Sequence, residues 1–132
     1  MNIAIIDDCS ITCFVHKKLF NEVDKDVCVN TYLNAQSFLN DLKANKIEQP
    51  DVILTDYNLG SSNGAELINE IDNYKFNCNI EDKLDTYLVS SDTNIASIAE
   101  QCNKSIFKGF FMKPLQLQNV ENLLHKEFSV SA

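Results

Sequence analysis

The stretch DVILTD, residues 51–56, decides the fold because an unbroken apolar core of strand length ends there on a carboxylate. A run of this kind is typical of a strand buried on both faces of a parallel sheet. Two further runs have the same form, NIAII at residues 2–6 and TYLV at residues 86–89. A more mixed run at 26–32, typical of an edge, and a short one at 109–112 complete the set, so we expect five strands.

Stretches of helical period separate these runs. Because strands and helices alternate along the chain, the pattern predicts a βα repeat around one parallel sheet. The expected helices start at Ser10, Asn34, Gly64, Asp92 or Thr93, and after Pro114. In the first helix the apolar stripe expected to face the core consists of Ile11, Phe14, Val15 and Leu19. The polar stretch 73–85 lacks a helical period and predicts a long loop.

The composition limits the class of protein. The chain has 132 residues, 45% of them hydrophobic, and a net charge of −8; we expect one domain, residues 1–132. The charge opposes direct nucleic-acid binding, and no apolar stretch reaches the roughly 18–20 residues of a membrane span. Five scattered cysteines without a CxxC pair indicate reduced thiols, so we expect a cytoplasmic protein.

Polar residues of complementary type follow four of the predicted strands. In an open α/β sheet the ligand site lies beyond the carboxyl ends of the strands, near the point where the strand order reverses. We therefore expect these side chains to gather at one rim of the sheet. They are Asp7, Asp8, Asp56, Ser90 and Lys113.

A rim of three carboxylates and one ammonium favours a hard cation and a phosphoryl group. Clustered carboxylates repel one another unless a cation neutralises them, and Mg²⁺ prefers oxygen ligands, with Mn²⁺ as the alternative. We expect Asp8, Asp56 and the backbone carbonyl near Asn58 to bind the cation. Lys113 and the Ser90 hydroxyl are then expected to contact phosphoryl oxygens. Asp56 is placed to act as a nucleophile that forms an aspartyl phosphate.

This set of residues resembles the receiver domain of two-component response regulators, the chemotaxis-receiver type. The segment TDYNLGSSNGAELINEI, residues 55–71, is similar to the phosphoacceptor segment of that family. The resemblance implies a five-stranded (βα)5 flavodoxin-like fold with strand order 2-1-3-4-5. It implies that Asp56 is phosphorylated, that Asp7 and Asp8 bind magnesium, that Ser90 and Lys113 assist the transfer, and that Phe110 is the switch aromatic.

The resemblance also implies how the signal is transmitted. We expect Ser90 to move towards the phosphoryl group and Phe110 to turn inward, which changes the surface formed by the fourth helix, fifth strand and fifth helix. Asn58 and Asp92 resemble residues that tune the lifetime of the phosphoryl group, and rapid self-dephosphorylation is expected. The resemblance further implies a cis peptide bond between Lys113 and Pro114.

The implied partners are a histidine kinase or histidine phosphotransfer protein as donor and a downstream protein effector. We expect a stand-alone receiver, monomeric or dimeric upon phosphorylation, that catalyses only its own phosphorylation and dephosphorylation and is not otherwise an enzyme. Two alternatives are a pseudo-receiver that binds partners without phosphorylation and, less favoured, a metal-dependent phosphatase with an aspartyl nucleophile. His16 and His125 are interpreted as surface histidines, which opposes a histidine phosphocarrier.

Overall fold

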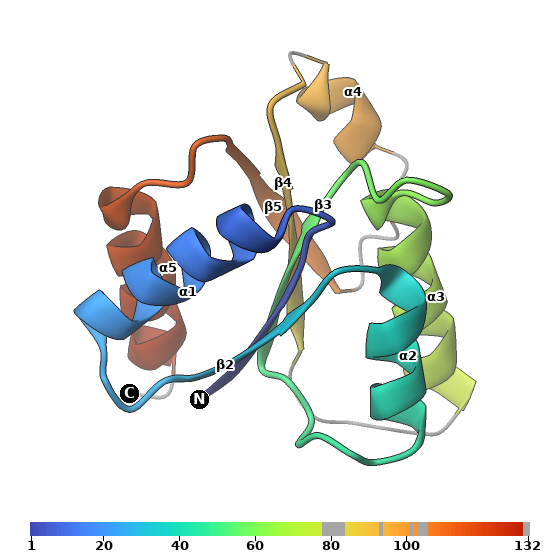
Figure 1. Cartoon of the computed structure of the whole chain (residues 1–132), viewed down its shortest axis with the longest axis horizontal. Helices are drawn as coiled ribbons and strands as arrows, with labels where there is room; N and C mark the ends of the chain where they lie inside the picture. The colour runs from blue at the N-terminus through green and yellow to red at the C-terminus, as the bar shows by residue number, and fades with distance from the viewer. Residues whose placement is uncertain (78–83, 93, 101, 103–105, 131–132) are drawn as a thin grey trace.

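A computed structural model describes residues 1–77, 84–92, 94–100, 102 and 106–130 (Figure 1). The strands form one parallel sheet in the order β2-β1-β3-β4-β5, as predicted. They are β1 (Asn2–Ile6), β2 (Cys28–Tyr32), β3 (Val52–Asp56), β4 (Asp85–Ser90) and β5 (Phe107–Met112). The helices are α1 (Ser10–Val23), α2 (Ala35–Lys43), α3 (Gly64–Asn77), α4 (Ile95–Ala99) and α5 (Leu117–Val130). The predicted fold class is confirmed.

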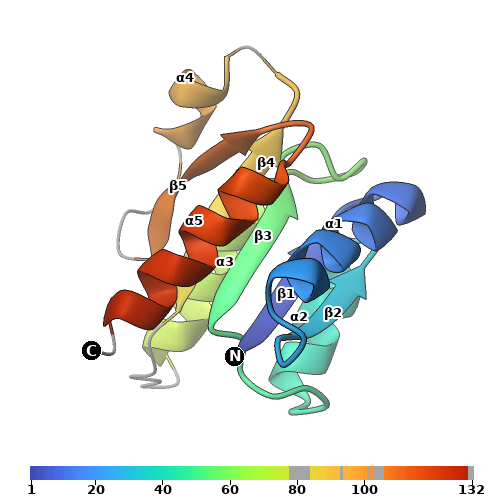
Figure 2. The same ribbon diagram turned by 90° about the vertical axis from the view of Figure 1, so that its left-hand side faces the viewer.

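The sheet is the middle of three layers, with α1 and α5 on one face and α2 and α3 on the other (Figures 1 and 2). Side chains alternate between the faces because the period of a strand is two residues. In β1, Ile3 and Ile5 pack with the α1 and α5 side chains, whereas Ala4 and Ile6 pack with those of α2 and α3. This two-sided burial explains the unbroken apolar runs. No helix among the described residues is long and apolar enough to span a bilayer.

Helix α1 faces the core with a stripe that includes only Leu19 of the four residues that the sequence predicted. Its buried residues are Cys13, His16 and Phe20, whereas the exposed fractions of Ile11, Phe14 and Val15 are 73%, 61% and 46%. The surface assignment of His16 is therefore wrong, while His125 is exposed as expected. Both stripes have helical spacing, so periodicity alone did not decide between them. The predicted cap is also displaced: Cys9, not Ser10, occupies the N-cap position, without a side-chain cap bond, so the helix begins one residue earlier than predicted.

Helix α3 starts beside β3 because residue 64 is a glycine. A Cβ at Gly64 would lie 2.6 Å from the Asp56 carbonyl oxygen and 2.7 Å from Cδ2 of Leu88, closer than real contacts allow. The helix then extends to Asn77, so the predicted loop is wrong for residues 73–77, and residues 78–83 lie outside the described part. The reason is that Tyr74 continues the apolar stripe and packs against the core on this face.

The other predicted helix starts are largely confirmed. The Asn34 side chain accepts a hydrogen bond from the Ser37 N–H at 2.8 Å and caps α2. Helix α4 is short and follows Asn94, whose N–H donates to Asp92 Oδ1 at 2.9 Å; Thr93 lies outside the described residues. The Lys113–Pro114 peptide bond is cis, as expected.

Candidate functional site

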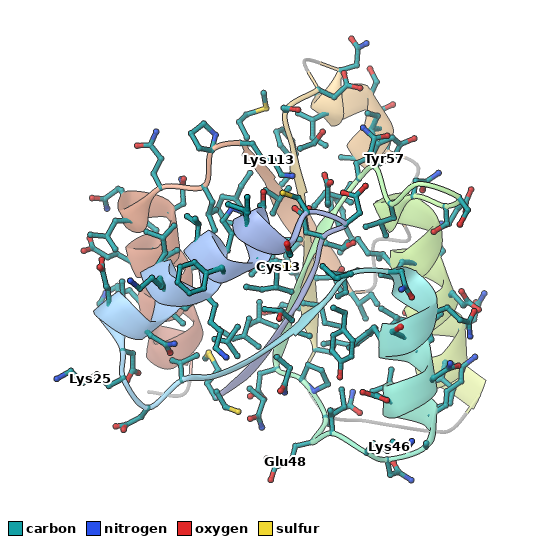
Figure 3. All side chains as sticks on the ribbon, in the orientation of Figure 1. Cys13, Lys25, Lys46, Glu48, Tyr57 and Lys113 are labelled. Atoms are coloured by element: carbon teal, nitrogen blue, oxygen red, sulfur yellow. The ribbon has the colours of Figure 1, made fainter. Side chains whose placement is uncertain are left out.

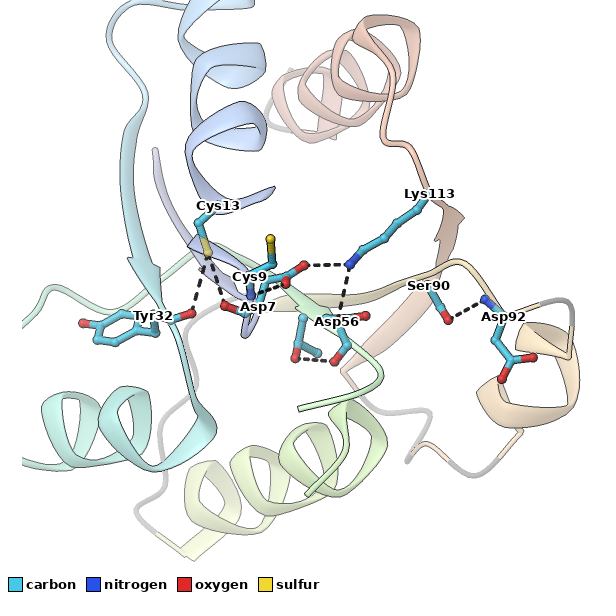
Figure 4. Close-up of polar contacts among 9 residues, drawn as sticks. Asp7, Cys9, Cys13, Tyr32, Asp56, Ser90, Asp92 and Lys113 are labelled. Atoms are coloured by element: carbon cyan, nitrogen blue, oxygen red, sulfur yellow. Dashed lines mark hydrogen bonds and ion pairs between the residues drawn. The ribbon is translucent and has the colours of Figure 1, made fainter. Parts of the chain in front are cut away.

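The polar residues that follow the strands meet at one rim of the sheet. Asp7 and Asp8 follow β1, Asp56 ends β3, Ser90 ends β4 and Lys113 follows β5. β1 and β3 are neighbours, and the strand order reverses between them. Figure 3 shows Lys113 on the same side of the molecule as Tyr57, the residue after the β3 carboxylate, and the close-up of Figure 4 shows Lys113 between two aspartates. The convergence of these elements is as predicted.

Three carboxylates form the acidic part of this site. One oxygen from each of Asp7, Asp8 and Asp56 lies within 4.8 Å of the other two. Asp7 and Asp56 are only 2% and 9% exposed, whereas Asp8 faces solvent. Three negative charges opposite one ammonium leave an excess that a divalent cation with oxygen ligands can neutralise. The donor set therefore fits the Mg²⁺ that the sequence analysis expected.

Lys113 is the cationic member of the site. Its Nζ donates to Asp7 Oδ2 at 2.8 Å and lies 3.3 Å from Asp56 Oδ2. Burial pulls the pKa of Lys113 down, but the bond to Asp7 and the charges of Asp56 and Asp7 outweigh it, so the pKa is raised above its ordinary value. The lysine is therefore charged at neutral pH.

Burial is the main cause that raises the pKa of Asp56, and the neighbouring charge of Asp7 acts in the same direction. Lys113 opposes both effects, while the charge of Asp8 adds to them. The raised pKa means that the ionised Asp56 is destabilised relative to a carboxylate in water. An added positive charge at this rim would relieve that destabilisation.

Asp7 is fixed through every one of its polar groups. Its N–H donates to the Tyr32 carbonyl at 2.9 Å, and its Oδ1 accepts from the Cys9 N–H at 2.9 Å. Its Oδ2 accepts from Lys113, and its own carbonyl accepts from the Cys13 thiol at 3.4 Å. Figure 4 shows the contacts of Asp7 with Cys9, Cys13 and Lys113. The first carboxylate of the site is thus connected to β2, α1 and the end of β5.

The hydroxyl of Ser90 is engaged away from the carboxylates. Ser90 is 1% exposed, and its Oγ accepts a hydrogen bond from the Asp92 N–H at 3.0 Å (Figure 4). The Asp92 carboxylate accepts from the Asn94 N–H. Ser90 is also connected to Lys113, because its carbonyl accepts from the Lys113 N–H at 2.9 Å. The predicted residues of β4 and β5 are therefore adjacent.

The remaining predicted residues lie near the site but outside its cluster of charges. Asn58 is exposed at the start of the loop between β3 and α3, where a single antiparallel bridge pairs it with Asn63. Phe110 is 40% exposed and pairs with Leu88 across β4 and β5. Its ring is therefore partly accessible to solvent.

Sequence reasoning missed two buried residues of α1 that adjoin the site. Burial raises the pKa of the Cys13 thiol to about 11. Burial also lowers the pKa of His16, so its imidazole is neutral at pH 7. His16 lines a mostly apolar cavity of about 390 Å³ together with Ser91, Lys113 and Pro114. Their spacing of three residues was a usable signal, but neither residue was placed on the stripe of α1 that was predicted to face the core.

Comparison with known proteins agrees with this geometry. The model of the response regulator receiver domain family matches residues 3–125. A search of curated protein sequences returned no match. Among solved structures, a two-component response regulator from Cytophaga hutchinsonii is 22% identical with a TM-score of 0.79, and the comparison covers 97% of this chain and 96% of that chain.

A second similar structure is the N-terminal domain of a response regulator/sensory box/GGDEF protein from Carboxydothermus hydrogenoformans. It is 17% identical with a TM-score of 0.78, over 99% of this chain and 96% of that one. At such identities the structures establish the fold, whereas the family model spans nearly the whole sequence. The chain belongs to the receiver domain family of two-component response regulators.

Proposed function

We propose that this chain accepts a phosphoryl group on Asp56 from a phosphohistidine of a histidine kinase or histidine phosphotransfer protein, in a reaction that requires Mg²⁺. The observation that supports this most strongly is the arrangement of one ammonium between two buried carboxylates. Lys113 Nζ lies 2.8 Å from Asp7 and 3.3 Å from Asp56. Phosphoryl transfer consists mostly of positioning and charge neutralisation, and these groups supply both.

In the proposed transfer, an Asp56 carboxylate oxygen attacks phosphorus as the bond from phosphorus to the donor nitrogen breaks, and the imidazole leaves. Lys113 exchanges its longer contact, with Asp56, for a hydrogen bond to a phosphoryl oxygen. Its shorter contact, with Asp7, holds the lysine ammonium in place. Bound Mg²⁺, held by Asp7, Asp8, Asp56 and the Asn58 carbonyl, would neutralise the carboxylates and the phosphoryl oxygens. Hydrolysis later returns the carboxylate and inorganic phosphate.

The exposed apolar face of α1 provides a docking surface for the donor protein. Ile11, Phe14 and Val15 are all more than 40% exposed, and Ile11 and Val15 line the cavity that Lys113 also borders. Exposed apolar side chains grouped in this way mark surfaces for protein partners. A donor that covers them brings its histidine to the rim on which Asp56 lies.

Transmission of the signal starts from the hydrogen bond between Ser90 Oγ and the Asp92 N–H. We infer that this bond breaks when the hydroxyl turns to a phosphoryl oxygen, and that Phe110 then moves from its half-exposed position into the space beneath α4. The α4–β5–α5 surface, on which Phe110, Met112 and Leu117 are each at least 40% exposed, changes with it. An effector protein reads that change. The two states must differ by only a few kcal/mol for one phosphoryl group to switch them.

The test identifies by chemical labelling which residue carries the phosphoryl group. The protein is incubated with a small acyl phosphate and Mg²⁺, then reduced with borohydride, which converts an aspartyl phosphate to homoserine, and digested for peptide mass mapping. Homoserine at position 56, absent in Asp56→Asn, is expected. Unmodified Asp56 in a protein that nonetheless binds its partners would favour the pseudo-receiver alternative. Continuous release of phosphate from other phosphate esters would favour the phosphatase.

A further inference from the structure

The Cys13 thiol lies against the backbone of the two strands next to the acidic cluster. It is 3% exposed, on the inner face of α1. Its sulfur lies 3.4 Å from the Asp7 carbonyl oxygen and 3.8 Å from that of Tyr32 (Figure 4). Both oxygens are acceptors, so the thiol is the donor. These two carbonyls are at the carboxyl ends of β1 and β2, where the metal-binding rim begins.

The Tyr32 carbonyl joins these contacts into one connected set. It accepts from the Asp7 N–H at 2.9 Å as well as from Cys13. Three other groups of Asp7 are bonded to Cys9, Lys113 and Cys13. Among the described contacts of Asp7, the Cys13 thiol is the side-chain group of α1 that reaches its backbone. Without that thiol, the Asp7 carbonyl loses its contact with the helix, and the turn keeps the backbone bond from the Cys13 N–H to the Cys9 carbonyl at 3.1 Å.

We propose that Cys13 is a positioning residue of the phosphoacceptor site, whose thiol fixes the backbone of Asp7 and thereby orients the Asp7 and Asp8 carboxylates for the divalent cation. The inference rests on the proposed function. Groups that orient metal ligands without touching the metal commonly change its affinity by about 10–100-fold when removed. A thiol is a weak donor, so the effect expected here is smaller, about 3–10-fold.

The test compares Cys13→Ala and Cys13→Ser with a matched control, Cys102→Ala. Alanine and serine have similar volumes, so the pair differs chiefly in the retained donor. Cys102 is a second buried thiol, 4% exposed in the core on the opposite face of the sheet. Its truncation reproduces the loss of a buried sulfur without touching the site.

Two readouts are taken on the full chain. Isothermal titration with Mg²⁺ is expected to give an affinity about 3–10-fold weaker for Cys13→Ala, intermediate for Cys13→Ser, and unchanged for Cys102→Ala. Without any cation, the Asp7 amide is expected to exchange its hydrogen several-fold faster in Cys13→Ala alone. Thermal melting separates these local effects from a general loss of stability, which all three variants share.

The proposal is overturned if Cys13→Ala retains the wild-type Mg²⁺ affinity and Asp7 exchange rate. It is also overturned if Cys102→Ala changes them equally, because the thiol would then serve only to fill the core. A wild-type protein that binds no Mg²⁺ rejects the proposed function. In that case the exchange rate of the Asp7 amide still decides whether Cys13 positions this backbone.

Discussion

Asp56→Asn is expected to stabilise the protein at neutral pH in the absence of a divalent cation. Oxygens of Asp7 and Asp8 lie within 4.8 Å of Asp56, and the ammonium of Lys113 lies 3.3 Å away. At an effective dielectric constant of about 20, each acidic neighbour costs about 3 kcal/mol and the lysine returns about 5 kcal/mol. The repulsions exceed the attraction by about 1 kcal/mol before the solvent screening of Asp8, which brings the two close to balance. Burial adds to the cost of the charge.

The gain in stability of Asp56→Asn over the wild type should increase from acidic to neutral pH. The folded-state pKa of Asp56 is raised above its ordinary value, mainly by burial. Stability from such a group is present below its unfolded pKa and is lost as the pH rises through the folded pKa. The wild type therefore approaches Asp56→Asn in acid, and the difference between them is largest at neutral pH.

The assay is urea unfolding of both proteins in EDTA at neutral and acidic pH, with Glu70→Gln as a control for loss of an exposed carboxylate on α3. An increase of about 1–3 kcal/mol in the unfolding free energy of Asp56→Asn, equivalent to about 4–10 °C in Tm, is expected at neutral pH. Added Mg²⁺ should stabilise the wild type more than Asp56→Asn. If Asp56→Asn is less stable than the wild type in EDTA at neutral pH, the electrostatic reasoning is refuted.

Three further predictions concern the chemistry, the packing and the switch. Lys113→Met should slow phosphorylation by acyl phosphate about 10²-fold or more, since it removes a preorganised donor; a rate near wild type in a mass-spectrometric time course contradicts this. Gly64→Ala should destabilise the protein by about 1–3 kcal/mol in urea unfolding, because its Cβ would overlap the Asp56 carbonyl and Leu88; an unchanged midpoint contradicts this. Ser90→Ala should still be phosphorylated but should leave the ring resonances of Phe110 unshifted in NMR spectra; wild-type shifts contradict the switch.

The fold and most of the site were predictable because they depend on rules local to each strand. An apolar run ends on Asp56, and similar runs come before Asp7 and Ser90. Because these strands are parallel, all three residues lie at the same ends of their strands. Their carboxyl ends must then meet at one edge. The position of Lys113 at this edge was predictable for the same reason, because it follows the β5 strand.

The orientation of α1 was not predictable from its periodicity. Two stripes of helical spacing exist on this helix, and the more apolar one, with Ile11 and Phe14, faces solvent. Which stripe is buried depends on how the helix packs on β1 and α5, a property of the tertiary structure. The consequence was that Cys13 and His16, which adjoin the site, were not placed on the face of α1 that packs there. The end of α3 was missed similarly, since Tyr74, in a polar segment, is partly buried against the core.

The most direct measurement of the central claim is the intact mass of the protein after incubation with a small acyl phosphate. Wild type and Asp56→Asn are each measured with Mg²⁺ and with EDTA. A gain of one phosphoryl group by the wild type with Mg²⁺, and by none of the other three samples, is predicted. A wild-type mass that never changes, or an equal gain by Asp56→Asn, would contradict the account.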